Sequence, residues 1–191
     1  IMFLTETGLS EVSLREAIAF ISLKTVTLDD ALDLAAFFRQ HKQLDAAQVS
    51  LEATLLRFSD NQQVLVASAA VAIEQGRDRD AGWFLERASQ RDAKFAIESA
   101  EAYRKGRNFQ RALYMNGQAV DSLEKTRQRF GLFIEGQQYE RAISMRPRLQ
   151  RLGLLTDDAV KYGLAYCYFH VSDAVQADEL LKNISDKKIF Q

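Results

Sequence analysis

The sequence is poor in the residues that build tight turns and sheets. It has one proline, Pro147, and nine glycines among 191 residues, too few for the frequent turns of an all-β domain. It also has no run of eighteen apolar residues, so we expect no transmembrane segment in this chain. Alanine, leucine, glutamine and arginine are abundant, and 47% of the residues are hydrophobic. The composition therefore predicts an all-α fold.

Residues for catalysis and metal binding are equally scarce. There is one cysteine, Cys167, and there are two histidines, His41 and His170. A single cysteine allows neither an internal disulfide nor a cysteine cluster for zinc. Glycine-rich phosphate loops, the nucleophile elbow and the zinc-protease helix signature are all missing. We therefore expect no cofactor, no metal and no catalytic residue, and we interpret the protein as a non-enzyme.

Cys167 and His170 form the one pair that could carry out chemistry. They lie three residues apart on a predicted helix, and a cysteine beside a histidine is how several hydrolases form a thiolate. The surrounding stretch "AYCYFHV" is crowded and apolar, however, and free cysteines are usually buried. No acidic residue is placed to orient the histidine. We therefore favour a structural role for Cys167.

The formal net charge of -1 hides an uneven distribution. Residues 104–151 contain eleven Lys or Arg against four Asp or Glu, a net charge of +7. Residues 1–103 carry -6, and residues 152–191 carry -2. Aromatic residues lie within the basic block, so nucleic-acid binding is an alternative function. Most of those aromatics occupy recurring packing positions, and the whole chain is slightly acidic, so we do not favour it.

A pattern recurs along the chain with a period of 30 to 35 residues. "AYRKGRNFQRALYMNGQAV" (102–120) and "LFIEGQQYERAISMRPRLQ" (132–150) align thirty positions apart. A small or apolar residue followed twelve positions later by alanine occurs five times: Ala35/Ala47, Ala69/Ala81, Ala100/Ala112, Phe130/Ala142 and Ala165/Ala177. Three residues after the first member comes Phe38, Ala72, Tyr103, Phe133 or Tyr168. This periodicity predicts stacked helix–turn–helix units.

Caps and breakers place the helix ends within this frame. We predict helices over residues 13–24, 28–40, 45–58, 62–75, 80–90, 93–105, 109–120, 123–135, 139–152, 157–169 and 174–184. Predicted helix caps, which accept the unpaired first amides, are Ser13, Thr27, Ser59, Asp121 and Thr156. Pro147 lies inside one predicted helix, where it removes a hydrogen bond. We expect a kink or an early end there.

The repeat resembles the tetratricopeptide repeat (TPR) over about residues 28–186. This resemblance implies a right-handed superhelix, an α-solenoid of about five helix–turn–helix repeats, with residues 13–24 as an N-terminal leader helix. We expect one domain over residues 1–191. The chain begins at Ile1, and "SDKKIFQ" is typical of a helix start, so we also expect this domain to be a fragment of a longer protein.

The resemblance also implies a function as a protein-interaction scaffold. In TPR geometry the first helix of each pair lines a concave wall, which here would include Arg39, Gln63, Lys94, Glu98, Glu101, Arg104, Arg127, Gln128, Tyr162, Tyr166 and Phe169. We expect this wall to bind an acidic or amphipathic segment of another protein. Arg104 and Arg127 would contact its charge, and Tyr162 and Tyr166 its apolar side chains. The family's carboxylate clamp needs asparagines that this wall lacks.

Two stretches suggest a cellular setting. "RALYMNGQAVDSLEKTRQR" and "RLGLLTDDAVKYGLAYCYF" are similar to periplasmic TPR proteins of TonB-type systems in Gram-negative bacteria. The similarity implies a cell-envelope assembly and favours the periplasm over the cytoplasm, although the residues themselves leave the localisation unknown. The alternatives to a scaffold are an enzyme of unrecognised class and a nucleic-acid-binding helical repeat protein.

Overall fold

The structure is a computed structural model that describes residues 10–185, with side chains from residue 14 onward. Within these residues every regular element is a helix. The chain divides into two compact units, residues 1–119 and 120–191, and we describe each by itself. The predicted helix start in "SDKKIFQ" and the predicted cap Ser13 lie outside the residues or side chains that the structure describes.

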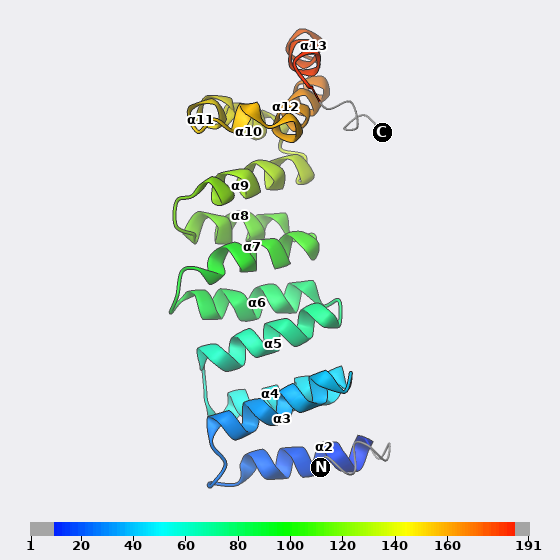
Figure 1. Ribbon diagram of the computed structural model, residues 1–191, viewed down its shortest axis with the longest axis vertical. Helices are drawn as coiled ribbons and strands as arrows, with labels where there is room; N and C mark the ends of the chain where they lie inside the picture. The colour runs from blue at the N-terminus through cyan, green and yellow to red at the C-terminus, as the bar shows by residue number, and fades with distance from the viewer. Residues whose placement is uncertain (1–9, 186–191) are drawn as a thin grey trace. The chain divides into compact units, whose positions relative to one another are not determined.

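The first unit contains seven helices in its described part. They are α2 (Ser10–Ser22), α3 (Leu28–Gln40), α4 (Leu44–Arg57), α5 (Gln62–Glu74), α6 (Asp78–Ser89), α7 (Phe95–Lys105) and α8 (Phe109–Gln118). From α3 onward each helix packs against the next along the chain, and α2 packs against α4 (Figure 1). The elements α3–α4, α5–α6 and α7–α8 are thus the predicted helix–turn–helix pairs.

The second unit continues the pattern with one broken helix. It contains α9 (Leu123–Glu135), α10 (Tyr139–Ser144), α11 (Arg146–Arg151), a 3₁₀ turn at Leu154–Thr156, α12 (Asp158–His170) and α13 (Ala174–Lys182). The predicted helix over 139–152 is interrupted at Met145, and Pro147 lies in the first turn of α11, where its missing amide costs least. The expected break near Pro147 is confirmed.

Small residues at the repeat positions let the helices of each pair approach closely. Ala47, Ala81, Ala112 and Ala142 are fully buried. Their partners twelve positions earlier are also buried. The large side chain that fills the remaining space usually follows on the first helix. In the α5–α6 pair it comes from the second helix instead, since Ala72 shares a core cluster with Phe84.

The turns inside the five pairs share one backbone geometry. Each has one residue in the left-handed region, and these residues are Lys42, Gly76, Arg107, Gln137 and Ser172, with φ of 60°, 71°, 57°, 57° and 64°. The next amide donates back to a carbonyl five residues earlier, as from Gln43 to Phe38 at 2.9 Å and from Asn108 to Tyr103 at 2.8 Å. This bond satisfies a carbonyl that the helix end leaves unpaired.

We predict that Gly76→Ala destabilises the first unit by about 1 kcal/mol, because an alanine is strained at positive φ. Gly117→Ala in α8 is the matched control, since an added Cβ meets no atom within 4 Å at either position. That change should instead stabilise by about 0.5 kcal/mol. Urea denaturation measures both. Equal effects of the two substitutions would contradict a role for backbone strain.

Two polar arrangements fix helix ends in the first unit. Thr27 caps α3, since its hydroxyl accepts from the amide of Asp30 and the Asp30 carboxylate accepts from the amide of Thr27 at 2.8 Å. The Thr27 hydroxyl also donates to the Asp30 carboxylate at 2.7 Å, and this bond, with the one from the Thr27 amide, lowers the pKa of Asp30. At the end of α2, the Arg57 guanidinium of α4 donates to the carbonyls of Ile21, Leu23 and Lys24 at 2.7, 2.6 and 3.1 Å.

Candidate functional site

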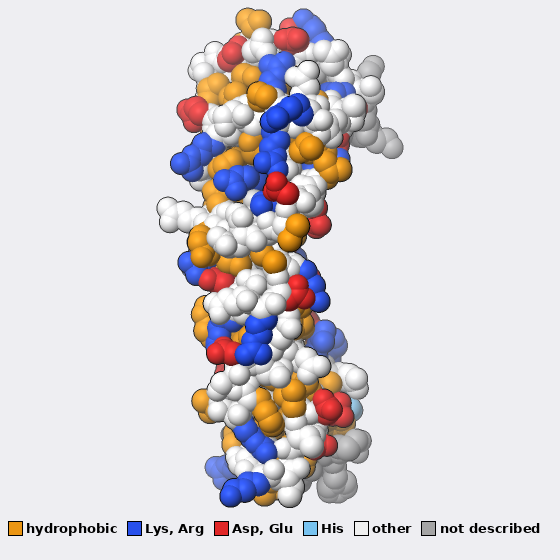
Figure 2. All heavy atoms as spheres, turned by 90° about the vertical axis from the view of Figure 1, so that its left-hand side faces the viewer, with side chains coloured by type: hydrophobic (Ala, Val, Ile, Leu, Met, Phe, Trp, Pro, Cys, Tyr) orange, Lys and Arg blue, Asp and Glu red, His pale blue; other side chains and the backbone are white. Residues whose placement is uncertain are grey.

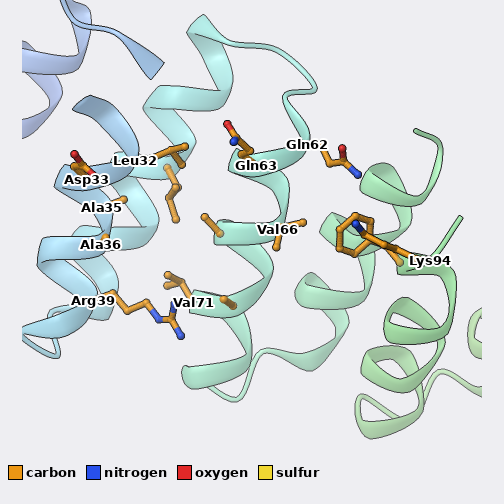
Figure 3. Close-up of a pocket in the computed structure, with 14 residues that line it drawn as sticks. Leu32, Asp33, Ala35, Ala36, Arg39, Gln62, Gln63, Val66, Val71 and Lys94 are labelled. Carbon is orange, nitrogen blue, oxygen red and sulfur yellow. The ribbon is translucent and has the colours of Figure 1, made fainter. Parts of the chain in front are cut away.

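An open groove in the first unit runs across α5, from α3 to the start of α7 (Figure 3). Its volume is about 580 Å³, which is within the range of ligand pockets. It is lined by Leu32, Asp33, Ala35, Ala36, Arg39, Leu51, Gln62, Gln63, Val66, Ala67, Ala70, Val71, Lys94 and Phe95. The groove therefore lies along the first helices of three successive pairs.

The groove floor consists of small and aliphatic side chains at helical spacing. Gln63, Val66, Ala67 and Ala70 lie on successive turns of α5, so they share one face of that helix. Ala36 of α3 is exposed, and Val66, Ala67 and Ala70 are half-buried. Because the alanine side chains are short, the floor leaves room for the side chains of a bound segment.

Charged side chains border this floor. Arg39 donates to Glu74 at 2.5 Å, and Lys42 lies 3.8 Å from the same carboxylate. Lys94 pairs with Asp92 at 2.8 Å and lies over the ring of Phe95, 4.9 Å from its centroid. Arg39, Gln63 and Lys94 were predicted for the concave wall, and all three line the groove.

Arg104 and Arg127 lie in different units, and each is paired with a carboxylate. Arg104 donates to Glu101 one turn earlier on α7, at 2.8 and 2.6 Å, and this hydrogen bonding lowers the pKa of Glu101. Arg127 of α9 lies 2.5 Å from Asp157, the residue that caps α12. Neither arginine lines the groove.

Tyr162 and Tyr166 lie one turn apart on α12 and are brought to one exposed face, with Phe169 in the next turn. Their exposed fractions are 38%, 40% and 70%. The Tyr166 ring packs edge-on against Tyr139 at 5.9 Å and lies 4.3 Å from His170. Arg127 forms an ion pair with Asp157, which caps the start of this same helix. The second unit thus presents an aromatic face on α12.

Comparison with known proteins places the fold. No family model matches the sequence, and no curated protein matches it. Solved structures do match. MamA aligns with a TM-score of 0.64 and 14% identity over 81% of this chain and 88% of its own. YrrB, described as a TPR protein with an unusual peptide-binding site, aligns with a TM-score of 0.63 and 14% identity over 88% of this chain and 89% of its own.

A tetratricopeptide repeat protein from Parabacteroides merdae aligns with a TM-score of 0.55 and 15% identity over 96% of this chain and 75% of its own. The chain has the tetratricopeptide-repeat fold. The predicted all-α helical repeat is therefore confirmed. Identities of 14 to 15% to these structures show the fold alone, and function in a TPR fold depends on its side chains.

The surroundings of Cys167 bear on its role. Its side chain is fully buried in α12, and this burial raises the pKa of the thiol to about 11. The group is therefore protonated at neutral pH, unlike a catalytic thiolate. The His170 ring stacks on Tyr139 at 4.5 Å. These surroundings favour the structural role predicted for Cys167.

Residues 10–185 contain no group of three or more histidine, cysteine or carboxylate side chains placed to hold a metal ion. In the same residues no helix has the length and apolarity needed to cross a bilayer.

Sequence reasoning missed the alanines of the groove floor. Ala67 and Ala70 lie three residues apart on α5, and Ala36 lies on α3 at the position that Ala70 has on α5, but buried alanines of TPR pairs show similar spacing. The groove alanines differ from the buried ones in register. None of the three occupies the repeat positions at which Ala35 and Ala69 pair with an alanine twelve residues later.

Proposed function

We propose that this protein is a non-catalytic interaction scaffold whose α3–α5–α7 groove binds a segment of a partner protein. The observation that carries the proposal is an open groove with a small-residue floor and a charged border on the first helices of a TPR fold. An amphipathic helix or extended segment can lay its apolar side chains into such a groove. The peptide-binding site named for YrrB, which has a similar fold, supports this proposal.

The groove favours a partner segment that is apolar on one face and polar at its edges. Leu32, Val66 and Phe95 offer apolar contact along the floor. Arg39 and Lys94 are charged and exposed at the border, where they can approach acidic groups of the partner. The carboxylates beside them already neutralise part of this charge, so the apolar floor should supply most of the affinity.

The predicted contact residues add a second proposed surface, on α12 of the second unit, and a separate proposed contact at Arg104 of the first unit. Tyr162 and Tyr166 would pack on apolar side chains of the partner, and aromatic residues often dominate such contacts. Arg127, beside α12, and Arg104, on α7, would attract acidic residues, which predicts association that slows with added salt. The cell-envelope role implied by sequence similarity is also a proposal, which fractionation of the source organism would test.

We predict that blocking the groove lowers the affinity for the partner segment about tenfold or more. The partner is first identified by affinity capture and mass spectrometry, and its binding segment is then titrated against purified variants. Ala36→Trp and Ala70→Trp each place a large ring in the groove. The matched control is Ala19→Trp, which changes an exposed alanine of α2 outside the groove.

The same titration shows whether the partner binds the groove, the aromatic face of α12, or both. Loss of affinity in Tyr162→Ser with Tyr166→Ser, at unchanged helicity, would assign the aromatic face of α12 to the same partner. Wild-type affinity in both groove variants would overturn the proposed site. Capture of nucleic acid alone, with no protein partner, would overturn the scaffold function itself.

A further inference from the structure

A second pocket, on the other unit, has four cations among its lining residues. It lies between α9 and the α10–α11 segment and has a volume of about 560 Å³. Lys125, Arg129, Arg141 and Arg148 line it, and Asp121 is the one acidic residue among the lining side chains. We call this the α9–α11 basic pocket. Its lining carries a formal charge of +3.

The cations come from three helices. Lys125 and Arg129 are four residues apart on α9, so they project from the same face one turn apart. Arg141 lies on α10 and Arg148 on α11. On the face of this unit that Figure 2 turns to the viewer, Lys and Arg side chains lie close together. Like charges gathered around one cavity repel one another, so an anion bound there would relieve part of this repulsion.

The acidic side chain in the pocket neutralises only part of this charge. Asp121 is shared by two cations, with Lys125 Nζ at 3.2 Å and Arg148 Nη2 at 3.4 Å. Hydrogen bonding by Lys125, with the charges of Lys125 and Arg148, lowers the pKa of Asp121. The carboxylate therefore remains ionised and cannot serve as a proton donor to a bound anion near neutral pH.

Arg129 and Arg141 have neutral neighbours instead. The Arg129 guanidinium lies over the ring of Phe133, 5.5 Å from its centroid. Arg141 donates to the amide oxygen of Gln138 at 2.9 Å. Across residues 10–185, neither guanidinium is ion-paired to a carboxylate. Each therefore retains donors that can bind a ligand, because a guanidinium has five.

The geometry points to a phosphate monoester dianion as the ligand of this pocket. Guanidinium groups bind phosphate through two parallel hydrogen bonds, and a monoester carries close to two negative charges and three acceptor oxygens. A single carboxylate would compensate less of the +3 charge. Phe133 and Met145 also line the pocket and give its carbon part an apolar wall. This site is independent of the proposed groove in the first unit.

The test is an NMR titration of the full 191-residue chain with three probes. These are inorganic phosphate, a phosphoserine peptide, and the same peptide with unmodified serine. Phosphate and the phosphopeptide should shift backbone amides within residues 125–133 and 141–148, and unmodified peptide should not. A phosphopeptide that binds about tenfold tighter than phosphate would identify a protein-borne phosphate as the source. Equal affinities would support a free phosphate as the ligand.

Charge-matched variants test the assignment. Arg129→Gln and Arg141→Gln should each weaken phosphate binding about tenfold or more. Arg129→Lys keeps the charge but loses the planar fork, and it should give a smaller loss. Arg151→Gln removes the same charge from an exposed position of α11 outside the pocket, and it should bind as wild type does. Circular dichroism confirms that each variant is folded.

Three results would overturn the proposal. The first is that neither phosphate nor the phosphopeptide shifts any amide of the pocket. The second is a loss of phosphate affinity in Arg151→Gln as large as the loss in Arg129→Gln, which would indicate attraction by net charge alone. The third is that unmodified peptide binds as tightly as the phosphopeptide, which would show no preference for a phosphate group.

Discussion

Phe84→Ala should lower the free energy of unfolding of the first unit by about 3 to 5 kcal/mol. The ring is 93% buried, with an exposed fraction of only 7%, and it belongs to a cluster that includes Leu65, Ala72 and Leu85. Removing it deletes a large apolar surface and leaves a cavity among helices that alanines hold close together. Urea denaturation followed by circular dichroism measures the loss.

A double substitution tests why this ring matters. Ala72→Phe alone should overpack the same cluster and cost about 1 to 3 kcal/mol. Combined with Phe84→Ala, it moves the large side chain back to the first helix, the arrangement found in the α3–α4 pair, where Phe38 is fully buried. The two changes should therefore compensate by about 1 to 3 kcal/mol.

The neighbouring aromatic is the control for this experiment. Trp83 is 47% exposed, and its ring lies under the Arg87 guanidinium. Trp83→Ala should cost at most about 1 kcal/mol. Strict additivity of the Ala72 and Phe84 substitutions would contradict the exchange of volume between the two helices.

Leu164→Ala should be the corresponding large effect in the second unit, with a cost of about 2 to 5 kcal/mol. Leu164 is fully buried on α12, a helix that packs against α10 and α13. In a repeat fold each element contacts mainly its sequence neighbours, so the loss should be largest near the substitution. Hydrogen exchange should show faster amide exchange in α10, α12 and α13.

Leu123→Ala is the matched control, because Leu123 begins α9 and is 52% exposed. It should change stability by no more than about 0.5 kcal/mol. The same exchange data for Leu164→Ala should leave the amides of α3 to α6 nearly unchanged. Uniform acceleration throughout both units would contradict local propagation and indicate that the whole chain unfolds as one cooperative block.

The helices could be predicted closely because periodicity, caps and breakers agree. The bounds of α3 and α9 match the prediction, and Thr27 caps α3 as expected. Other caps were wrong: Asn61 caps α5 instead of Ser59, and Ser122 caps α9 instead of Asp121. Before α5, Asp60 has φ of 55°, which delays the helix start. Several adjacent polar residues could serve as caps, and only the turn geometry selects one.

The cap of α12 could not be predicted from the sequence for the same reason. Asp157 caps this helix instead of the predicted Thr156, whose hydroxyl donates to Gly153 within the preceding 3₁₀ turn. The choice depends on the left-handed conformation of Gly153, with φ of 70°. A sequence pattern contains the residues for both arrangements but does not say which turn the chain adopts.

The sites could be predicted only in part. The resemblance to the tetratricopeptide repeat implied a wall that includes Arg39, Gln63 and Lys94, and all three line the groove. It could not show that Arg104 binds Glu101 or that Arg127 binds Asp157, since rotamers and neighbouring turns decide these pairs. The basic block was visible in the sequence, but which of its eleven cations surround one pocket depends on how α9 packs with α10 and α11.

The Arg57 contact with the end of α2 has a mechanical consequence. A force applied to α2 along the chain would reach α4 by three routes: the connection that leads into α3, the packing of α2 on α4, and the three hydrogen bonds of the guanidinium. These bonds act in parallel and share one rigid planar group, so they must break almost together. Arg57 therefore acts as a tether, and α2 should detach under load in a single step instead of fraying turn by turn.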